Sequence, residues 1–335
     1  MAVVPARAET DSGRSPTLQR REERSAWAFM LPSVLLLLVF LVAPFVMAIG
    51  FSFTNQRLIS NPNRPTRFVG LEHYQEIAAD MGEAVETAVT NITTGDDGRL
   101  PTLPKALWNN LLFAIIVVPI QTALALFLAM LINQKIKFSN VFRTIYFVPV
   151  VVPMVVVAVI WTFLYNPGEG TINAFLQTIS FGLIGPFDWL NDPALAFPAI
   201  MILSIWQGVG FQMVIYLAGL QEIPEELYEA AAMDGANKVQ EFFYVTLPML
   251  RNTTIFVVVS TTILAFRLFD QIQVMTQGGP QNATVTAVLH VVNVGFRNQR
   301  IGEASAITII FFLIVLAISL VQRAFLREER TVQES

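Results

Sequence analysis

The clearest capacity for specific contacts lies in a polar stretch at residues 221–252, QEIPEELYEAAAMDGANKVQEFFYVTLPMLRN, between two long apolar stretches. Pro224 suits the first turn of a helix, because a residue there has no intrahelical partner for its N–H group. Glu225 and Glu226 complement the positive N-terminal end of that helix. The pattern predicts a short helix through Met233.

A break and a second helical piece are expected after this helix. Asp234 and Gly235 end it, since glycine accepts the left-handed conformation that closes a helix and aspartate can cap the next one. A second amphipathic piece is predicted from about Asn237 to Tyr244, ending before Leu247 and Pro248. The stretch should form a bent, two-helix element on one face of a membrane.

The surface of the first helix suits contact with another protein. Ala230, Ala231 and Ala232 keep the helix narrow, so that a partner could approach its backbone closely, and Glu229 offers a charge for an ionic contact. The properties of these residues alone leave two interpretations of the stretch open, an ordinary amphipathic interfacial loop and a docking element.

Polar side chains inside apolar stretches form a second candidate site, since they are costly in a membrane and often functional. Ser204, Gly208, Gln212 and Tyr216 recur every four residues and share one helical stripe, with Gln207 beside it. Helix packing is the favoured reading for Ser204 and Gly208. For Gln212 and Tyr216 both packing and a substrate pathway stay open.

Further along, Arg267 and Asp270 are three residues apart and are expected to pair with each other on a helix near the membrane interface. Gln271 lies one turn beyond Arg267 and is a further pathway candidate.

Composition excludes several kinds of chemistry. The absence of cysteine excludes disulfides and thiolate metal sites, and the two histidines, His73 and His290, are not spaced as metal ligands. No lysine follows a glycine, so the chain has no phosphate-binding loop for ATP. A net charge of −4 disfavours nucleic acid as a partner. A membrane-embedded enzyme would need a convergent nucleophile, metal site or acid–base pair, and a chain with no cysteine and two isolated histidines offers little material for one.

The elements that must position these residues are membrane-spanning helices. Of the 335 residues, 54% are hydrophobic and only 14% are charged, and a helix needs about 20 mostly apolar residues to cross a bilayer. The sequence predicts an all-α polytopic protein with about six spans, in a permease domain at 26–325. The spans lie at about 27–53, 107–133, 144–165, 194–220, 253–275 and 302–321.

The distribution of basic residues predicts the orientation. Thirteen lysines and arginines fall in the two ends and the segments after the second and fourth spans, against seven in the other set of segments. Because positive segments stay cytoplasmic, both termini and the polar stretch are expected inside the cell. Residues 1–25 are read as a disordered tail and 326–335 as a second tail. Within the acidic region near 80–98, the part rich in Asp, Glu, Thr and Gly from about Asn91 to Gly98 is read as a solvated, partly flexible insertion.

The polar stretch resembles a known family element. Glu-Ala-Ala at 229–231, two residues, Asp-Gly at 234–235, nine residues, and Val-Thr-Leu-Pro at 245–248 together resemble the EAA loop of ABC importer permeases. The residues 68–74 (FVGLEHY), 218–220 (AGL), 269–270 (FD) and 278–280 (GGP) are similar to carbohydrate-type permeases of the maltose and glycerol-phosphate importers. His73 departs from that pattern, where Asn is common.

The resemblance implies a type I ABC importer permease whose motor lies in another chain. Glu229 would make an ionic contact with an ATPase, the alanines and Gly235 would permit close packing, and Asp234 would provide the bend, within a motif completed by Leu247 and Pro248. The turn formed by Gly278, Gly279 and Pro280 would lie near the periplasmic gate, or would simply end the fifth span.

The resemblance also implies partners and a location. An ATP-binding subunit dimer that holds ATP and Mg, a second permease subunit in a different chain, an extracytoplasmic solute-binding protein and membrane lipid are expected, with no cofactor in this chain. The location would be a bacterial inner membrane, and the substrate a sugar, polyol or glycerol derivative. A secondary transporter driven by an ion gradient is the alternative, although such proteins carry ionisable residues at mid-membrane.

Overall fold

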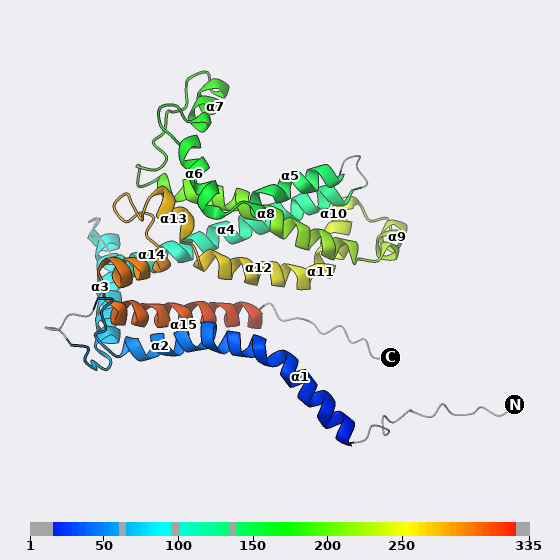
Figure 1. The fold of residues 1–335 in the computed structure, drawn as a ribbon. Helices are drawn as coiled ribbons and strands as arrows, with labels where there is room; N and C mark the ends of the chain where they lie inside the picture. The colour runs from blue at the N-terminus through cyan, green and yellow to red at the C-terminus, as the bar shows by residue number, and fades with distance from the viewer. Residues whose placement is uncertain (1–15, 60–64, 95–100, 135–138, 326–335) are drawn as a thin grey trace.

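The computed structural model describes residues 16–59, 65–94, 101–134 and 139–325, and these are almost entirely helical. Long helices lie side by side and form a bundle (Figure 1). Apart from two isolated bridges, the described residues contain no β structure. The predicted all-α class is confirmed.

Five helices are long and apolar enough to cross a membrane, and a bent pair raises the number to six. The candidate spans within the described residues are Ser25–Ser52, Thr102–Asn133, Ala196–Gln221, Arg251–Met275 and Ile301–Ala324, with the bent pair Val141–Val151 and Met154–Leu164. The corresponding elements are α1 (Pro16–Leu37) with η1 (Leu38–Val42) and α2 (Ala43–Ser52), α4 (Thr102–Asn133), α8 (Ala196–Gln221), α12 (Arg251–Phe266) with α13 (Asp270–Met275), α15 (Ile301–Phe325), and the pair α5 (Ser139–Val151) and α6 (Met154–Leu164).

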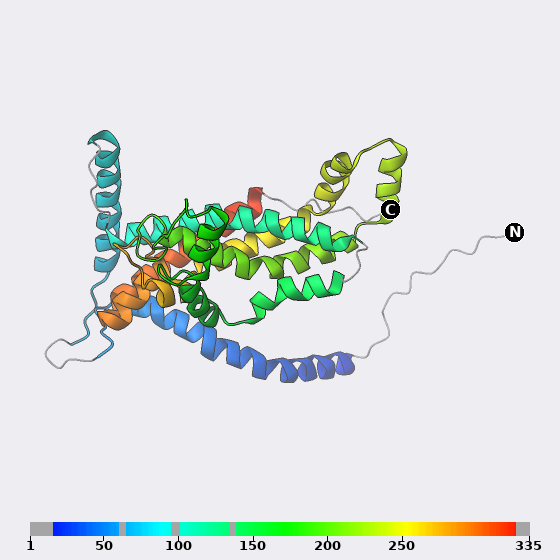
Figure 2. The same ribbon diagram turned by 90° about the horizontal axis from the view of Figure 1, so that it is seen from above.

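The remaining helices connect or cap these spans. They are α3 (Glu72–Thr94), α7 (Thr171–Ile179), α9 (Glu225–Met233), α10 (Lys238–Glu241) with the π-helical η2 (Phe242–Thr246) and α11 (Leu247–Met249), and α14 (Ala287–Val292) with the π-helical η3 (Asn293–Arg297). The α9 and α3 elements lie at opposite ends of the bundle (Figures 1 and 2).

The first helix begins earlier than predicted. It starts at Pro16, so the reading of residues 1–25 as a disordered tail is wrong from Pro16 onward, and residues 1–15 lie outside the described part. Proline is favoured at the first turn of a helix, and the polar residues that follow it are compatible with a helix that extends past the membrane. The tail predicted at 326–335 also lies outside the described residues.

The third span is bent sharply, which corrects the prediction of one straight helix at 144–165. The axes of α5 and α6 meet at 99° around Val152 and Pro153. Proline disfavours the helical conformation of the residue before it, and Pro153 itself has extended geometry with ψ 135°. Pro153 therefore starts α6 as its N-cap instead of continuing α5.

The fifth span is interrupted between Phe266 and Asp270. Phe269 adopts a non-helical conformation there, with φ −146° and ψ −58°. Arg267 and Asp270 consequently do not lie on one continuous helix, and no ion pair joins them among the described residues. The expected pair is wrong, because its spacing rule applies only within an unbroken helix.

Asn110 of α4 satisfies the backbone at this break. Its amide nitrogen donates to the carbonyl of Phe266 at the end of α12 (3.3 Å), and its amide oxygen accepts from the N–H of Ala287 at the start of α14 (2.8 Å). Helix ends leave such groups without intrahelical partners, and membranes supply no water to bind them. The fully buried Asn110 thus connects two helix termini to α4.

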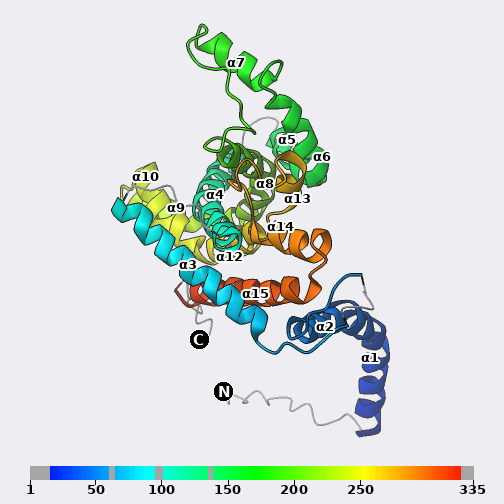
Figure 3. The ribbon, with the colours of Figure 1, turned by 90° about the vertical axis from the view of Figure 1, so that its left-hand side faces the viewer.

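Much of the first loop is a helix, which the sequence did not predict. The helix α3 runs across the N-terminal ends of α4 and α15, roughly perpendicular to the spans (Figures 2 and 3). Ile77 packs in a small cluster with Leu103, Val294 and Ile307. This contact with three other elements anchors the helix to the bundle, while residues 95–98 of the predicted insertion lie outside the described part.

We predict that Asn110→Ala destabilises the protein by about 1–3 kcal/mol, because it leaves a buried carbonyl and a buried N–H without partners. Thermal unfolding of the purified protein in detergent should show a midpoint lowered by a few degrees. The control is Asn298→Ala, since Asn298 is exposed. Equal midpoints for both variants would contradict the role given to Asn110.

Candidate transport pathway and coupling element

The helix α9 projects from one end of the bundle (Figures 1 and 2). As predicted, it begins after Pro224 and ends at Met233, with Glu225 and Glu226 in its first turn. None of its residues is buried, and Met233 is 87% exposed. A short helix with no core of its own needs other contacts to stay in place.

The C-terminal end of α9 is closed by a Schellman motif. The N–H of Ala236 donates to the carbonyl of Ala231 (2.9 Å), and the N–H of Gly235 donates to that of Ala232 (3.1 Å). Gly235 has φ +81°, a left-handed conformation that glycine adopts without steric cost. The predicted break at this glycine is confirmed.

The cap of the next helix differs from the prediction. Asn237, not Asp234, starts α10. Its side-chain oxygen accepts from the N–H groups of Val239 and Gln240, and the side-chain oxygen of Gln240 accepts from the N–H of Asn237. This reciprocal capping box fixes the start of the second helix. Asp234 instead occupies the C-cap position of α9.

The second piece continues past Leu247 and Pro248, which the sequence placed beyond its end. A π-helical turn, η2, immediately precedes them. Proline cannot donate to the preceding turn and clashes with it, and the wider π turn accommodates this. The same arrangement, η1 before Pro44, occurs in the first span. The chain therefore runs almost without interruption from α10 into α12.

The surface of the α9–α11 segment (residues 224–250) is open to a partner. Glu229, Ala230, Asp234 and Gly235 are exposed and Ala231 is half-buried, while Leu247 and Pro248 are exposed on the second piece. Tyr228 joins the two pieces, with its hydroxyl 3.0 Å from the hydroxyl of Thr246. The salt bridge from exposed Lys238 to buried Glu241 (2.8 Å) further stabilises α10.

A cleft of about 120 Å³ lies between the spans. Most of its lining is apolar, but uncharged polar side chains also reach it, and it is called the polar cleft below. It is lined by residues of α4, α6, α8, α12 and α13, and by Leu268 in the break between α12 and α13. Its polar side chains are Gln121, Ser204, Gln207, Thr261 and Gln271. No charged side chain of the described residues lines it, so the cleft offers neutral hydrogen-bond donors and acceptors.

Hydrogen bonds hold some of these side chains in place. Gln271 donates to the hydroxyl of Ser204 (3.2 Å), and Gln212 donates to that of Thr261 (2.6 Å). The cleft is also shaped by Gly208, where an added Cβ would collide with the amide nitrogen of Gln121.

The predicted pathway residues separate into three places. Gln207 and Gln271 line the cleft, and Gln212 lies behind it through its bond to Thr261. Tyr216 is fully buried in an apolar cluster with Met213 and Leu250, away from the cleft lining. Its surroundings are those of a packing residue, so packing is the better of the two readings left open for it.

Sequence reasoning missed Gln121 and Thr261. A signal was present, because each is an uncharged polar residue within a predicted span, but such residues also serve in helix packing. Their convergence on Gln207 depends on how α4, α8 and α12 pack, which spacing along one helix does not give.

The Gly278-Gly279-Pro280 turn lies outside the cleft lining, after α13. Gly278 has φ +91°, and Thr284 donates to the carbonyl of Gly279 (2.7 Å). Asn109 of α4 anchors the following strand-like segment by donating to the carbonyl of Val285 (2.8 Å). The turn is thus fixed against the same helix that forms one wall of the cleft.

Several apolar spans, a neutral polar cleft among them and an exposed helix at one end define a polytopic membrane permease. Residues 121–331 match the family described as binding-protein-dependent transport system inner membrane component, and the chain belongs to this family.

Relatives match this chain over nearly its whole length. A probable ABC transporter permease of Bacillus subtilis is 33% identical over 90% of this chain and 95% of its own length. The trehalose/maltose transport system permease protein MalF of Thermococcus litoralis is 32% identical over 93% and 96%. The sn-glycerol-3-phosphate permease UgpA of Pectobacterium atrosepticum is 28% identical over 95% and 100%.

Solved structures share the fold. A subunit of a bacterial ABC transporter that imports the acidic polysaccharide alginate aligns with a TM-score of 0.73 and 22% identity, covering 95% of this chain and all of that one. The alginate transporter in complex with an alginate pentasaccharide-bound periplasmic protein gives 0.75 and 20% identity, covering 94% of this chain and 98% of that one.

We predict that Gly235→Ala loosens the end of α9 by about 1 kcal/mol, because the left-handed conformation is unfavourable for alanine. Hydrogen exchange should be about fivefold faster in peptides that cover α9 and unchanged in those from α8. Gly82→Ala is the control, since Gly82 lies in the right-handed helix α3 with open space around its Cα. Unchanged exchange in both variants would contradict the assignment.

Proposed function

We propose that this permease carries a neutral sugar or related polyol for an ATP-driven importer, and that α9 docks on a separate ATP-binding subunit. The observation that carries the proposal is α9 itself. It is a nine-residue helix without a buried residue, closed at its C-terminal end by a Schellman motif and exposing Glu229 and Ala230. A rigid, uncovered helix of this kind suits a cleft in a partner protein.

The connections of α9 allow it to transmit movement. Its N-terminal end follows α8 after only three residues, and its C-terminal side leads through α10, η2 and α11 into α12. Both α8 and α12 line the polar cleft, through Gln207 and Thr261. A displacement of α9 by closure of an ATPase would therefore move two walls of the cleft together.

The hydrogen bond between Tyr228 and Thr246 strengthens this connection. It joins α9 to the helical segment that continues into α12, so the two pieces would move as one body. ATP and Mg would be held by the partner, since no glycine–lysine pair of a phosphate-binding loop occurs in this sequence.

The chemistry of the cleft favours an uncharged substrate. Hydroxyl groups of a sugar can exchange hydrogen bonds with amides and hydroxyls such as Gln207, Gln271 and Thr261, and the lining holds no base to neutralise an acidic substrate. Relatives include permeases named for trehalose/maltose, arabinooligosaccharides, lactose and sn-glycerol-3-phosphate. Of these classes the neutral sugars fit best.

The assembly and orientation follow from the same proposal. The α9 end, where α1 begins and α15 ends, would face the cytoplasm of a bacterial cell, and the α3 end would face the solute-binding protein. A second permease chain would complete the pathway, because this chain surrounds only a small cleft and leaves extensive apolar surface on α1, α2 and α5 exposed.

Charge reversal tests the docking role. Glu229→Lys should reduce co-purification of the ATP-binding subunit and abolish ATP-dependent uptake, since it replaces a favourable ionic contact by a repulsive one. Glu169→Lys makes the same charge change at an exposed position on the loop before α7 and should leave both unchanged. Full assembly and transport in the Glu229→Lys variant would contradict the proposed docking role of α9.

Removing a cleft amide tests the pathway. Gln207→Leu should raise the substrate concentration for half-maximal uptake about three- to tenfold, the value of one lost hydrogen bond, with assembly intact. The matched control is Gln322→Leu, because Gln322 bonds to Thr262 outside the cleft. Equal effects in the two variants would indicate a general packing defect and contradict a pathway role.

A further inference from the structure

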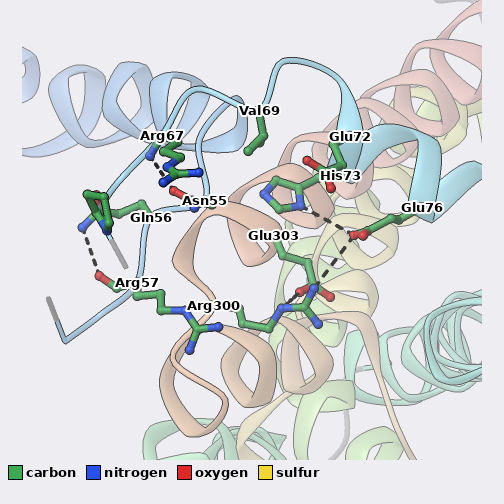
Figure 4. Close-up of a pocket in the computed structure, with 11 residues that line it drawn as sticks. Asn55, Gln56, Arg57, Arg67, Val69, Glu72, His73, Glu76, Arg300 and Glu303 are labelled. Atoms are coloured by element: carbon green, nitrogen blue, oxygen red, sulfur yellow. Dashed lines mark hydrogen bonds and ion pairs between the residues drawn. The ribbon is translucent and has the colours of Figure 1, made fainter. Parts of the chain in front are cut away.

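A second pocket, of about 440 Å³, lies at the α3 end of the bundle, away from the polar cleft. Figure 4 shows its walls, which come from three separate segments: the chain after α2, the start of α3 and the start of α15. Its volume falls within the range of small-molecule sites. This charged pocket has no part in the function proposed above.

Backbone contacts build the pocket. Isolated bridges pair Thr54 with Phe68 and Arg57 with Arg300. The N–H of Gly302 donates to the carbonyl of Gln56 (3.0 Å), which fixes the start of α15 against the first loop. The walls are therefore joined to one another before any ligand binds.

The charges within the pocket are separated. Arg57 and Arg67 come from the first loop, and neither forms an ion pair with a described carboxylate. In Figure 4 they lie on one side, and Glu72, His73 and Glu76 lie on the other. The pocket thus has a cationic side and an anionic side.

Part of the anionic side is already engaged. Glu76 is 3.9 Å from Arg300 and 3.6 Å from the Nδ1 atom of His73, and Arg300 also pairs with Glu303. Glu72, in contrast, forms no ion pair with a described basic residue. Two guanidinium groups and one carboxylate are consequently available to a ligand.

The flanks of the pocket are apolar and uncovered. Leu58 and Ile59 follow Arg57 and are 49% and 61% exposed, while Phe68 follows Arg67 and is 79% exposed. The pocket lies where the first span (α2) ends and the last span (α15) begins, the level at which lipid headgroups meet the acyl chains. A ligand with a charged head and apolar tails fits both features.

We propose that the charged pocket binds the zwitterionic headgroup of an aminophospholipid from the leaflet at the α3 end. The phosphate lies against the guanidinium groups of Arg57 and Arg67, which match its geometry. The primary ammonium group donates to the carboxylate of Glu72. The acyl chains cover Leu58, Ile59 and Phe68.

This chemistry separates lipid classes. A phosphatidylethanolamine headgroup supplies both charges and three N–H donors. A phosphatidylcholine headgroup has the same charges but no N–H donor, and phosphatidylglycerol has no cation for Glu72. The expected order of affinity is ethanolamine above choline, with glycerol lacking the contact to the carboxylate.

Native mass spectrometry of the purified, assembled transporter tests the proposal with short-chain lipids of these three headgroups. The double variant Arg57→Gln/Arg67→Gln should bind the ethanolamine lipid at least about tenfold more weakly, the effect of losing charge-assisted hydrogen bonds. Glu72→Gln should remove the preference for ethanolamine over choline. Arg297→Gln, another exposed arginine at this end but outside the pocket, is the control.

Two further measurements distinguish a bound lipid from other occupants of the pocket. Free phosphoethanolamine should bind more weakly than the short-chain lipid, and equal binding would assign the pocket to a soluble compound instead. Because all three substituted residues are exposed, their replacement should leave thermal unfolding unchanged. Unaltered lipid affinity in the double variant, or loss of solute-binding-protein docking with lipid binding intact, would overturn the proposal.

Discussion

The structure depends on satisfying backbone hydrogen bonds at the places where its membrane helices are broken. A continuous helix needs no help within a bilayer, but each interruption leaves N–H and C=O groups without partners. The α12–α13 break and the start of α14 meet this requirement through Asn110, and the segment after the glycine–proline turn meets it through Asn109. Both side chains belong to α4, which therefore organises one end of the bundle.

The helix α4, which carries these two asparagines, also forms one wall of the cleft. Gln121 of α4 lies opposite Gly208 of α8, where the absence of a side chain leaves room for the amide. Thr261 of α12 completes the facing wall. A broken fifth span held by asparagines thus places neutral polar groups inside an apolar bundle, while α8 and α12 extend from the cleft to the exposed helix α9. The proposed transport function needs both features in one rigid framework.

The sequence predicted those structural features that depend only on residues close to one another along the chain. The end of α9 followed from Gly235, because one left-handed residue closes a helix whatever its surroundings. Apolar length predicted the spans for the same reason. The bend at Pro153 was also locally signalled, yet hydropathy alone treats two helices around a proline as one apolar run.

Features that depend on packing could not be predicted in this way. Asn110 is paired with residues more than 150 positions away, and nothing in its local sequence identifies them. The pairing of Arg267 with Asp270 failed because the break at Phe269 is supported from α4. Gln207 and Gln271 could be proposed as pathway residues from their cost in a membrane, whereas Gln121 and Thr261 became recognisable only when three helices were placed side by side.

Uptake of radiolabelled sugars by proteoliposomes that contain the assembled transporter tests the central claim most directly. The account predicts accumulation of a neutral sugar only when ATP and the solute-binding protein are both supplied, with no effect of ionophores. Accumulation without ATP that follows an imposed ion gradient would contradict it.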